Sequence, residues 1–338
     1  MDTTGILDES LERLHVSGPE RDGWLSNHGP MAVEALVRHG QAPVVHRWLD
    51  YYSAKLEDMP PTDTPVTAAN WQAALGDPRR IADWTVYFAR DTAERPWRDV
   101  LAEWWPRLLP GIAAGATHPA IRVGHAVRTL LTTDETAPRV MELAHALGYW
   151  AARHQPLPAL GLLAPVPDAA AALDAVPRVP DQTGGIVERF AGLTAFPDWP
   201  PARGLPLAPD DVRDRLAELV AAAVHRYASH GHGAPIMLVH AATAPNAVLR
   251  TLPALPHELW APSLEAAWAA SAAVTAAYSP ATPAPYAPTR LTSEEVFERA
   301  AAHGDDHTIK FTDTALDVGD GTALAAAVRS IDLNEPAL

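Results

Sequence analysis

Two histidines lie seven residues apart in the segment ATHPAIRVGHAVRTLL, which covers residues 116–131 and contains His118 and His125. In a helix, seven residues return to nearly the same face after about 10.5 Å along the axis, so two such imidazoles can bind one metal ion. However, the chain has 15 histidines, and His39 and His46 show the same interval. On spacing alone, partly buried histidines bonded to backbone carbonyls are the simpler explanation, and a metal site needs further residues.

Two other histidines occupy positions where imidazole could serve as a ligand. His28 lies in LSNHGPMAVEAL, where Gly29 and Pro30 should end a loop and begin a helix, with a capping or turn histidine as the alternative. His240 ends the apolar run APIMLVH, so we expect it to be buried and neutral, the state in which imidazole binds metals. A buried structural histidine is the alternative at that position.

Lys310 stands out because only two of the 26 basic residues are lysines, Lys55 and Lys310. Arginine keeps its proton, whereas a desolvated lysine can become a neutral amine and react with CO2 to give an anionic carbamate. Such a carbamate would offset metal charge beside neutral imidazoles. The alternative is a solvated surface lysine paired with Asp306 or Asp313.

Composition excludes several classes of protein and site. The 338 residues suffice for one large domain or two ordinary ones, and the absence of cysteine excludes disulfides, Cys-ligated metals and a thiol nucleophile. A net charge of −15 without a basic stripe argues against a nucleic-acid partner. The acidic N-terminus lacks a signal-peptide pattern, and no apolar run reaches membrane-spanning length, so we expect a cytoplasmic protein without a membrane partner. The P-loop, G-x-S-x-G, H-E-x-x-H and G-x-G-x-x-G motifs are all absent.

Apolar residues recur at three- and four-residue spacing through most of the chain, which predicts helices. The predicted helices cover residues 10–16, 30–40, 42–59, 77–94, 97–115, 119–131, 139–154, 210–230, 262–279, 293–304 and 321–331. The best strand candidate, residues 234–240, reads equally well as a helix. Prolines gather in residues 154–181 and 278–290, which we expect to be long connections. The pattern therefore predicts an all-α, irregular multi-helix bundle with long Pro-rich connections.

Helix starts are marked by capping residues and prolines. We expect N-caps at Asp77, Ser263 and Ser293. First-turn prolines are expected at Pro30, Pro78 and Pro119. A residue before proline is disfavoured in the α region, so His118 should be a cap-like residue with its helix beginning at Pro119.

The chain resembles the questin oxidase-like family over nearly its whole length. The similar segments are SNHGPMAVEAL, LGDPRRIADWTVYFARDTAERPWRDVLAEWWPRLLPGIAAGATHPAIRVGHAVR, LAHALGYWAARHQPLP, MLVHAATAPNAVLRTLP and DDHTIKFTDTAL. This resemblance implies a single helical domain over residues 1–338, in which an N-terminal half (1–155) and a C-terminal half (180–338) could pack around one site. It also implies an oxygenase that opens aromatic polyketide rings of the anthraquinone type, by a Baeyer–Villiger-like or dioxygenase-like cleavage.

The family further implies a mononuclear non-haem Fe(II) held by four histidines and a carboxylated lysine. Carried over by motif, the ligands are His28 in NHGP, His118 and His125 in THPAIRVGHA, His240 in LVHAAT, and Lys310 in HTIKFT. His307 lies three residues before Lys310, so in a helix it would share that face and could replace a ligand or orient the carbamate.

The implied reactants are O2, a small aromatic substrate, and electrons from either NADPH or the reduced substrate itself. Several aromatic side chains could line a pocket for a planar molecule, although core packing is the commoner role: Trp84, Tyr87, Trp104, Trp105 and Trp150. A metal-dependent hydrolase or cyclase and a non-catalytic helical protein that binds aromatic polyketides are the alternative functions. The sequence carries no signal for the oligomeric state.

Overall fold

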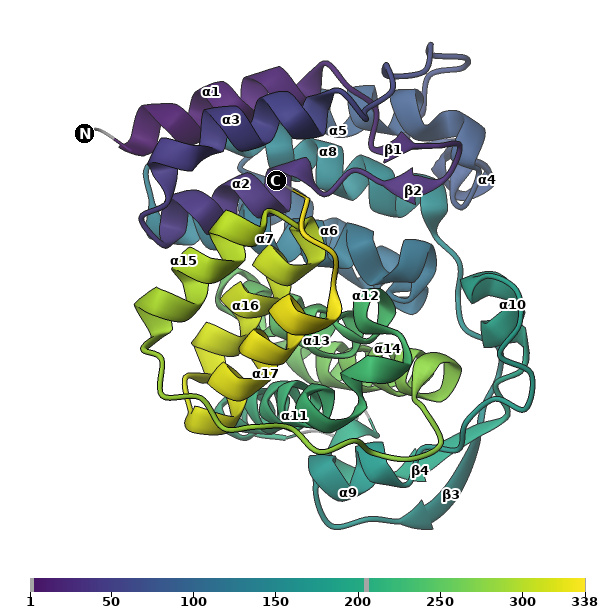
Figure 1. Cartoon of the computed structure of the whole chain (residues 1–338). Coiled ribbons are helices and arrows are strands. Elements are labelled where there is room, and N and C mark those ends of the chain that lie inside the picture. Colours follow the sequence, from purple (N-terminus) through teal and green to yellow (C-terminus); the bar gives the residue numbers. More distant parts are fainter. Residues whose placement is uncertain (1–2, 204–206, 338) are drawn as a thin grey trace. The chain divides into compact units, whose positions relative to one another are not determined.

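The computed structural model describes residues 3–203 and 207–337 of the chain (Figure 1). The chain divides into two compact units. The first comprises Met1–Pro156 and Pro253–Pro256, and the second comprises Leu157–Leu252 and His257–Leu338. Both units consist mainly of helices, so the all-α prediction is confirmed. In the described part of the chain, no helix is long and apolar enough to span a membrane.

The first unit is built from helices with one small antiparallel hairpin. Its helices are α1 (Thr3–His15), α2 (Gly29–Arg38), α3 (Ala42–Ser53), α4 (Trp71–Ala74), α5 (Ile81–Glu94), α6 (Trp97–Leu108), α7 (His118–Thr132) and α8 (Ala137–Arg153). Its hairpin pairs β1 (Glu20–Arg21) with β2 (Leu25–Ser26). Short 3-10 turns cover Pro78–Arg80, Leu109–Gly111 and Ala114–Thr117.

Helix α7 begins one residue earlier than the sequence predicts. His118 has helical dihedral angles (φ −54°, ψ −42°), so its expected cap-like conformation is wrong. The chain reverses in the preceding residues, because Gly115, Ala116 and Thr117 all have positive φ (53°, 55° and 69°). After this reversal the backbone at His118 already follows the helix. The turn therefore outweighs the tendency of a residue before proline to avoid the α region. A positive φ at the non-glycine residues Ala116 and Thr117 costs roughly 1–3 kcal/mol each.

The core of the first unit contains four of the five aromatic pocket candidates, whereas Tyr87 is partly exposed. Four tryptophans are fully buried: Trp84, Trp104, Trp105 and Trp150. Trp84 and Trp104 meet edge to face, with ring centroids 5.4 Å apart. The indole N–H of Trp150 donates to the carbonyl of Gly111 at 3.1 Å. These tryptophans therefore form packed core, the commoner of the two roles considered.

The second unit is also helical and contains a small parallel strand pair. Its helices are α9 (Ala169–Asp174), α10 (Ile186–Ala191), α11 (Pro209–His230), α12 (Pro235–Leu238), α13 (His240–Thr251), α14 (Trp260–Tyr278), α15 (Ser293–His303), α16 (Asp306–Val318) and α17 (Gly321–Leu333). Strands β3 (Gly161–Pro165) and β4 (Ala195–Asp198) pair in parallel. Helix α14 is buried along most of its length, and Ser271 on α14 donates to the carbonyl of Ala241 on α13 at 2.7 Å.

Helix starts agree with the sequence in part. Asp77 caps the turn that begins at Pro78, as predicted. Thr292 rather than Ser293 caps α15. Ser263 lies inside α14 and donates to the carbonyl of Leu259, because the helix already begins at Trp260.

Candidate metal centre

His28 and His118 form a stacked pair in the first unit. Their ring centroids lie 4.4 Å apart with the planes inclined by 25°, and both residues are buried. His28 precedes α2, and its backbone N–H donates to the hydroxyl of Tyr52 at 2.6 Å. The Nδ1 atom of His118 lies 2.6 Å from the carbonyl oxygen of Gly115. This contact assigns the proton to Nδ1 and the lone pair to Nε2, which is the form in which an imidazole binds a metal.

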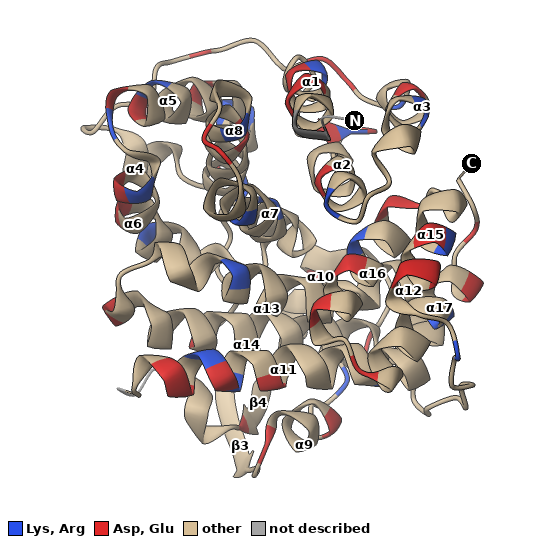
Figure 2. Cartoon of the chain, turned by 90° about the vertical axis from the view of Figure 1, so that its left-hand side faces the viewer, with Lys and Arg blue, Asp and Glu red and all other residues tan. Residues whose placement is uncertain are grey.

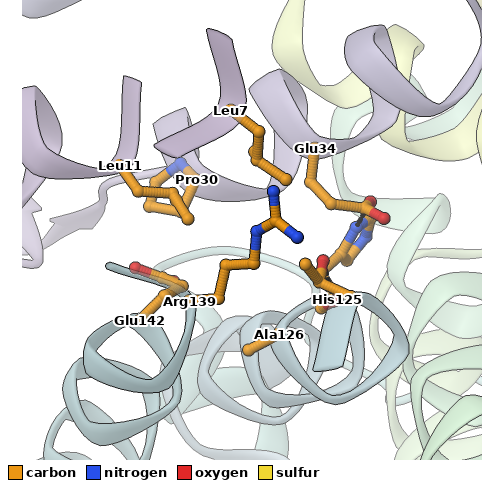
Figure 3. Close-up of a pocket in the computed structure, with 9 residues that line it drawn as sticks. Leu7, Leu11, Pro30, Glu34, His125, Ala126, Arg139 and Glu142 are labelled. Atoms are coloured by element: carbon orange, nitrogen blue, oxygen red, sulfur yellow. Dashed lines mark hydrogen bonds and ion pairs between the residues drawn. The ribbon is translucent and has the colours of Figure 1, made fainter. Parts of the chain in front are cut away.

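His125 lies two turns further along α7 and contacts a buried carboxylate. Its Nδ1 atom is 2.7 Å from Oε2 of Glu34 on α2, and Arg128 Nε donates to Oε1 of the same carboxylate at 3.0 Å. All three residues are buried, and Figure 3 shows Glu34 beside His125. A carboxylate on Nδ1 fixes the ring and directs the Nε2 lone pair away from Glu34, as in the carboxylate–histidine pairs of known metal sites.

A second buried ion pair holds α7 against α8. Arg122, between the two histidines of α7, donates from Nε and Nη2 to Glu142 on α8 at 2.5 and 2.7 Å. Helices α7 and α8 lie side by side (Figure 2). His15 Nε2 lies 3.0 Å from the same carboxylate. Burial alone would raise the pKa of Glu142, but Arg122 and His15 together outweigh it and lower the pKa to about 2. Burial, aided by His15 and Arg122, lowers the pKa of the neighbouring His145 to about 3.

A small cavity lies beside these ion pairs (Figure 3). Its walls include Leu7, Glu34, His125, Arg139 and Glu142, and its volume is about 10 Å³. A space of this size with several polar neighbours accommodates about one water molecule. It is far too small for an aromatic substrate.

The second unit holds His240, His307 and Lys310. His240 is the first residue of α13 and is fully buried, and its Nδ1 lies 3.1 Å from the carbonyl oxygen of Met237. This contact again places the lone pair on Nε2. His240 meets His307 edge to face, with ring centroids 5.6 Å apart. Both His307 and Lys310 lie on α16, so the helix that their spacing requires is present.

Lys310 is buried rather than solvated. It is 1% exposed, and its ammonium nitrogen has no hydrogen-bond partner within the described ranges. Burial lowers the pKa of Lys310 to about 8, although Asp306 and Asp305 act in the opposite direction. The surface lysine considered as an alternative is therefore wrong. A buried amine near its neutral form is the chemical requirement for reaction with CO2.

His307 contacts a neighbouring carboxylate. Its Nδ1 atom is 2.8 Å from Oδ1 of Asp306. Burial would lower the pKa of His307, but the charge of Asp306 and the hydrogen bonds with Asp305 and Asp306 outweigh it and raise the pKa. Asp305, Asp306 and His307 each offer a ligand atom within 4.8 Å of the others. Asp305 also caps α16 by accepting from the backbone N–H of Thr308.

The sequence patterns do not predict the carboxylates that contact these histidines. Glu34 occupies a buried position of α2, and a lone acid on the apolar side of MAVEAL is the signal that could have identified it. The five predicted ligands divide between the units, with His28, His118 and His125 in the first. His240 and Lys310 belong to the second.

Comparison with known proteins supports the resemblance seen in the sequence. A family model described as Questin oxidase-like matches residues 25–173. The match contains His28, His118 and His125 and ends before His240 and Lys310. No curated protein sequence matches the chain.

Proposed function

We propose, from a chain whose residues 25–173 match the Questin oxidase-like family, that the protein is a mononuclear non-haem iron oxygenase. The family is named for an oxidase, which supports the proposal of an oxidoreductase. The reaction that we propose is oxidative C–C cleavage in an aromatic polyketide such as an anthraquinone. The observation that carries the proposal is the set of buried imidazoles with Nε2 lone pairs, in a chain that also buries an amine without a partner.

In this proposal, the four histidines and the lysine supply ligands to one Fe(II). His118, His125 and His240 each keep the proton on Nδ1 and would bind through Nε2. His28, stacked on His118, would be the fourth imidazole. Imidazole is a good ligand for iron, and an iron ion so held would supply the activation of O2.

Lys310 would contribute an anionic oxygen after carboxylation. The neutral amine attacks CO2, a C–N bond forms, and one proton is released, which leaves a carbamate with one negative charge. The low pKa of Lys310 favours the neutral amine near pH 8. His307 would donate a hydrogen bond to the carbamate or replace one of the assigned ligands, with Asp306 accepting from its Nδ1.

Glu34 and Asp306 act through the histidines that they contact. Each carboxylate lies within hydrogen-bond distance of an Nδ1 atom, at 2.7 Å for His125 and 2.8 Å for His307. They hold the rings in one orientation, so that little rearrangement is needed when a ligand binds. The electrons come from NADPH or from the reduced substrate, which would be an electron-rich hydroquinone.

The test combines metal analysis with oxygen consumption. Purified protein should contain about one iron per chain and consume O2 when an anthrahydroquinone is added. His125→Ala and His240→Ala should lose both iron and turnover. His46→Ala should lose neither, because His46 is exposed and lies near Glu9.

Two outcomes would support the other functions. Stoichiometric zinc with no O2 consumption would indicate a hydrolase or cyclase, in which the metal acts as a Lewis acid. Protein without metal, whose binding of an anthraquinone is unchanged in both alanine variants, would indicate a non-catalytic binding protein. Density for a carboxylated side chain at Lys310, together with anomalous scattering at the iron edge, would test the ligand set directly.

A further inference from the structure

A groove in the second unit gathers three arginines from three separate elements. It encloses about 530 Å³ between the Pro-rich segment, α15 and α17. Arg290 comes from the segment, Arg299 from α15 and Arg329 from α17. Its volume lies in the range of about 300–1,000 Å³ that is typical of small-molecule sites.

The charge of this groove is opposite to that of the whole chain. Three arginines and a single acid, Asp332, line it, whereas the chain carries a net charge of −15. In the chain as described, none of the three arginines forms an ion pair or a side-chain hydrogen bond with another residue. The Nε atom of Arg329 is buried and has no partner.

Such unpaired guanidinium groups contrast with arginines elsewhere in the protein. Arg95 and Arg122, for example, each contact a carboxylate at 2.8 Å or less. Placing three positive charges around one groove with a single acid is unfavourable, and a buried N–H without an acceptor adds to the cost. A bound anion would remove both penalties.

The wall that carries Arg290 is held in place by backbone contacts and prolines. The backbone N–H of Ala284 donates to the carbonyl of Ser229 on α11 at 2.8 Å. At the other end, Thr292 and Glu295 form a reciprocal capping box at the start of α15. The prolines between these anchors fix φ, so the segment loses little further freedom when a ligand binds.

The lining favours a phosphate ester of a small organic molecule. Guanidinium groups form paired hydrogen bonds with phosphate oxygens. The positive charge of three arginines matches the charge of a phosphate or pyrophosphate group better than the single charge of one carboxylate. Beside them, Tyr286 is 40% exposed and offers a ring face for a planar group. We propose that this groove binds a phosphate-bearing small molecule, with Arg290, Arg299 and Arg329 contacting the phosphate.

Calorimetric titration of the full chain with inorganic pyrophosphate at low salt tests the proposal. We expect saturable binding at one site per chain. Arg290→Gln, Arg299→Gln and Arg329→Gln should each weaken it by about tenfold or more, the loss typical of one charge-assisted hydrogen bond. Arg329→Lys should also weaken binding, since it keeps the charge but loses the planar fork.

Arg213→Gln is the matched control, because Arg213 is an exposed arginine on α11 that pairs with Asp210 and Asp214. Its affinity should equal that of the wild type. Because Arg290 is exposed on an irregular segment, its variant should fold even if an Arg329 variant does not. Absence of saturable binding, or equal binding by the Arg290 variant, would overturn the proposal. Citrate binding as tightly as pyrophosphate would overturn the assignment to phosphate.

Discussion

Replacement of Glu142 by glutamine should strongly destabilise the protein, because it leaves the Arg122 guanidinium buried without its carboxylate. The two side chains are 3% and 5% exposed and are joined by hydrogen bonds of 2.5 and 2.7 Å. At roughly 1.4 kcal/mol per tenfold change in proton affinity, a pKa lowered from 4.5 to about 2 corresponds to about 3 kcal/mol. Breaking a buried pair by removing one partner typically costs about 3–5 kcal/mol. We therefore expect a loss of about 3–5 kcal/mol at pH 7.

Urea unfolding followed by circular dichroism measures this loss. The double variant Arg122→Met, Glu142→Leu removes both charges and should recover most of the stability. Glu103→Gln is the control, because its contacts with Arg95 and Arg107 are half-exposed and worth about 1 kcal/mol or less. The stabilisation should be present above about pH 4.5 and should be lost as the pH falls towards 2, because the unfolded chain takes up the proton first. Two results would refute the reasoning. One is a Glu142→Gln variant whose free energy of unfolding lies within 1 kcal/mol of the wild type, and the other is a double variant no more stable than Glu142→Gln.

Three further substitutions test other parts of the structure. Between pH 6.5 and about 3 only the unfolded chain protonates His145, so the wild type loses stability as the pH falls through this range. His145→Gln should make that loss smaller, which urea midpoints at pH 7 and pH 4 measure. Gly148→Ala should cost about 1–3 kcal/mol, because its Cβ would lie 2.9 Å from the backbone N of Thr85 and force α5 from α8. Thermal melts should show this loss, with Gly5→Ala as the control that is not destabilised, because space is open there and alanine favours the helix. Glu34→Gln should weaken the proposed Fe(II) binding about 10–100-fold by calorimetry, and an unchanged affinity would show that Glu34 does not orient His125 for the metal.

The sequence predicts the helices well because their apolar spacing is a local property. The start of α7 could not be read in this way, since the left-handed turn at Ala116 and Thr117 overrides the local preference at His118. The short strands β3 and β4 were also missed. They pair residues more than 30 positions apart, and their exposed strand Gly161–Pro165 has no alternating pattern.

The sequence offers candidate site residues by type, but it does not predict their contacts. Motif resemblance suggests the histidines and Lys310 as ligands, and the rarity of lysine draws attention to an amine that the structure shows to be buried. The partners of these residues depend on packing between helices. Glu34 reaches His125 across 91 positions of sequence, and no spacing rule connects the two.

The reversal that leads into α7 has a consequence for engineering. Thr117 combines a positive φ with a buried hydroxyl that has no hydrogen-bond partner among the residues described. Thr117→Gly should therefore raise the melting temperature, which is unusual for a change inside a core. The same change would give the backbone before His118 more freedom, so a variant selected for heat resistance alone would hold this imidazole less firmly. Screens for heat-resistant variants should therefore also measure the proposed oxygenase activity.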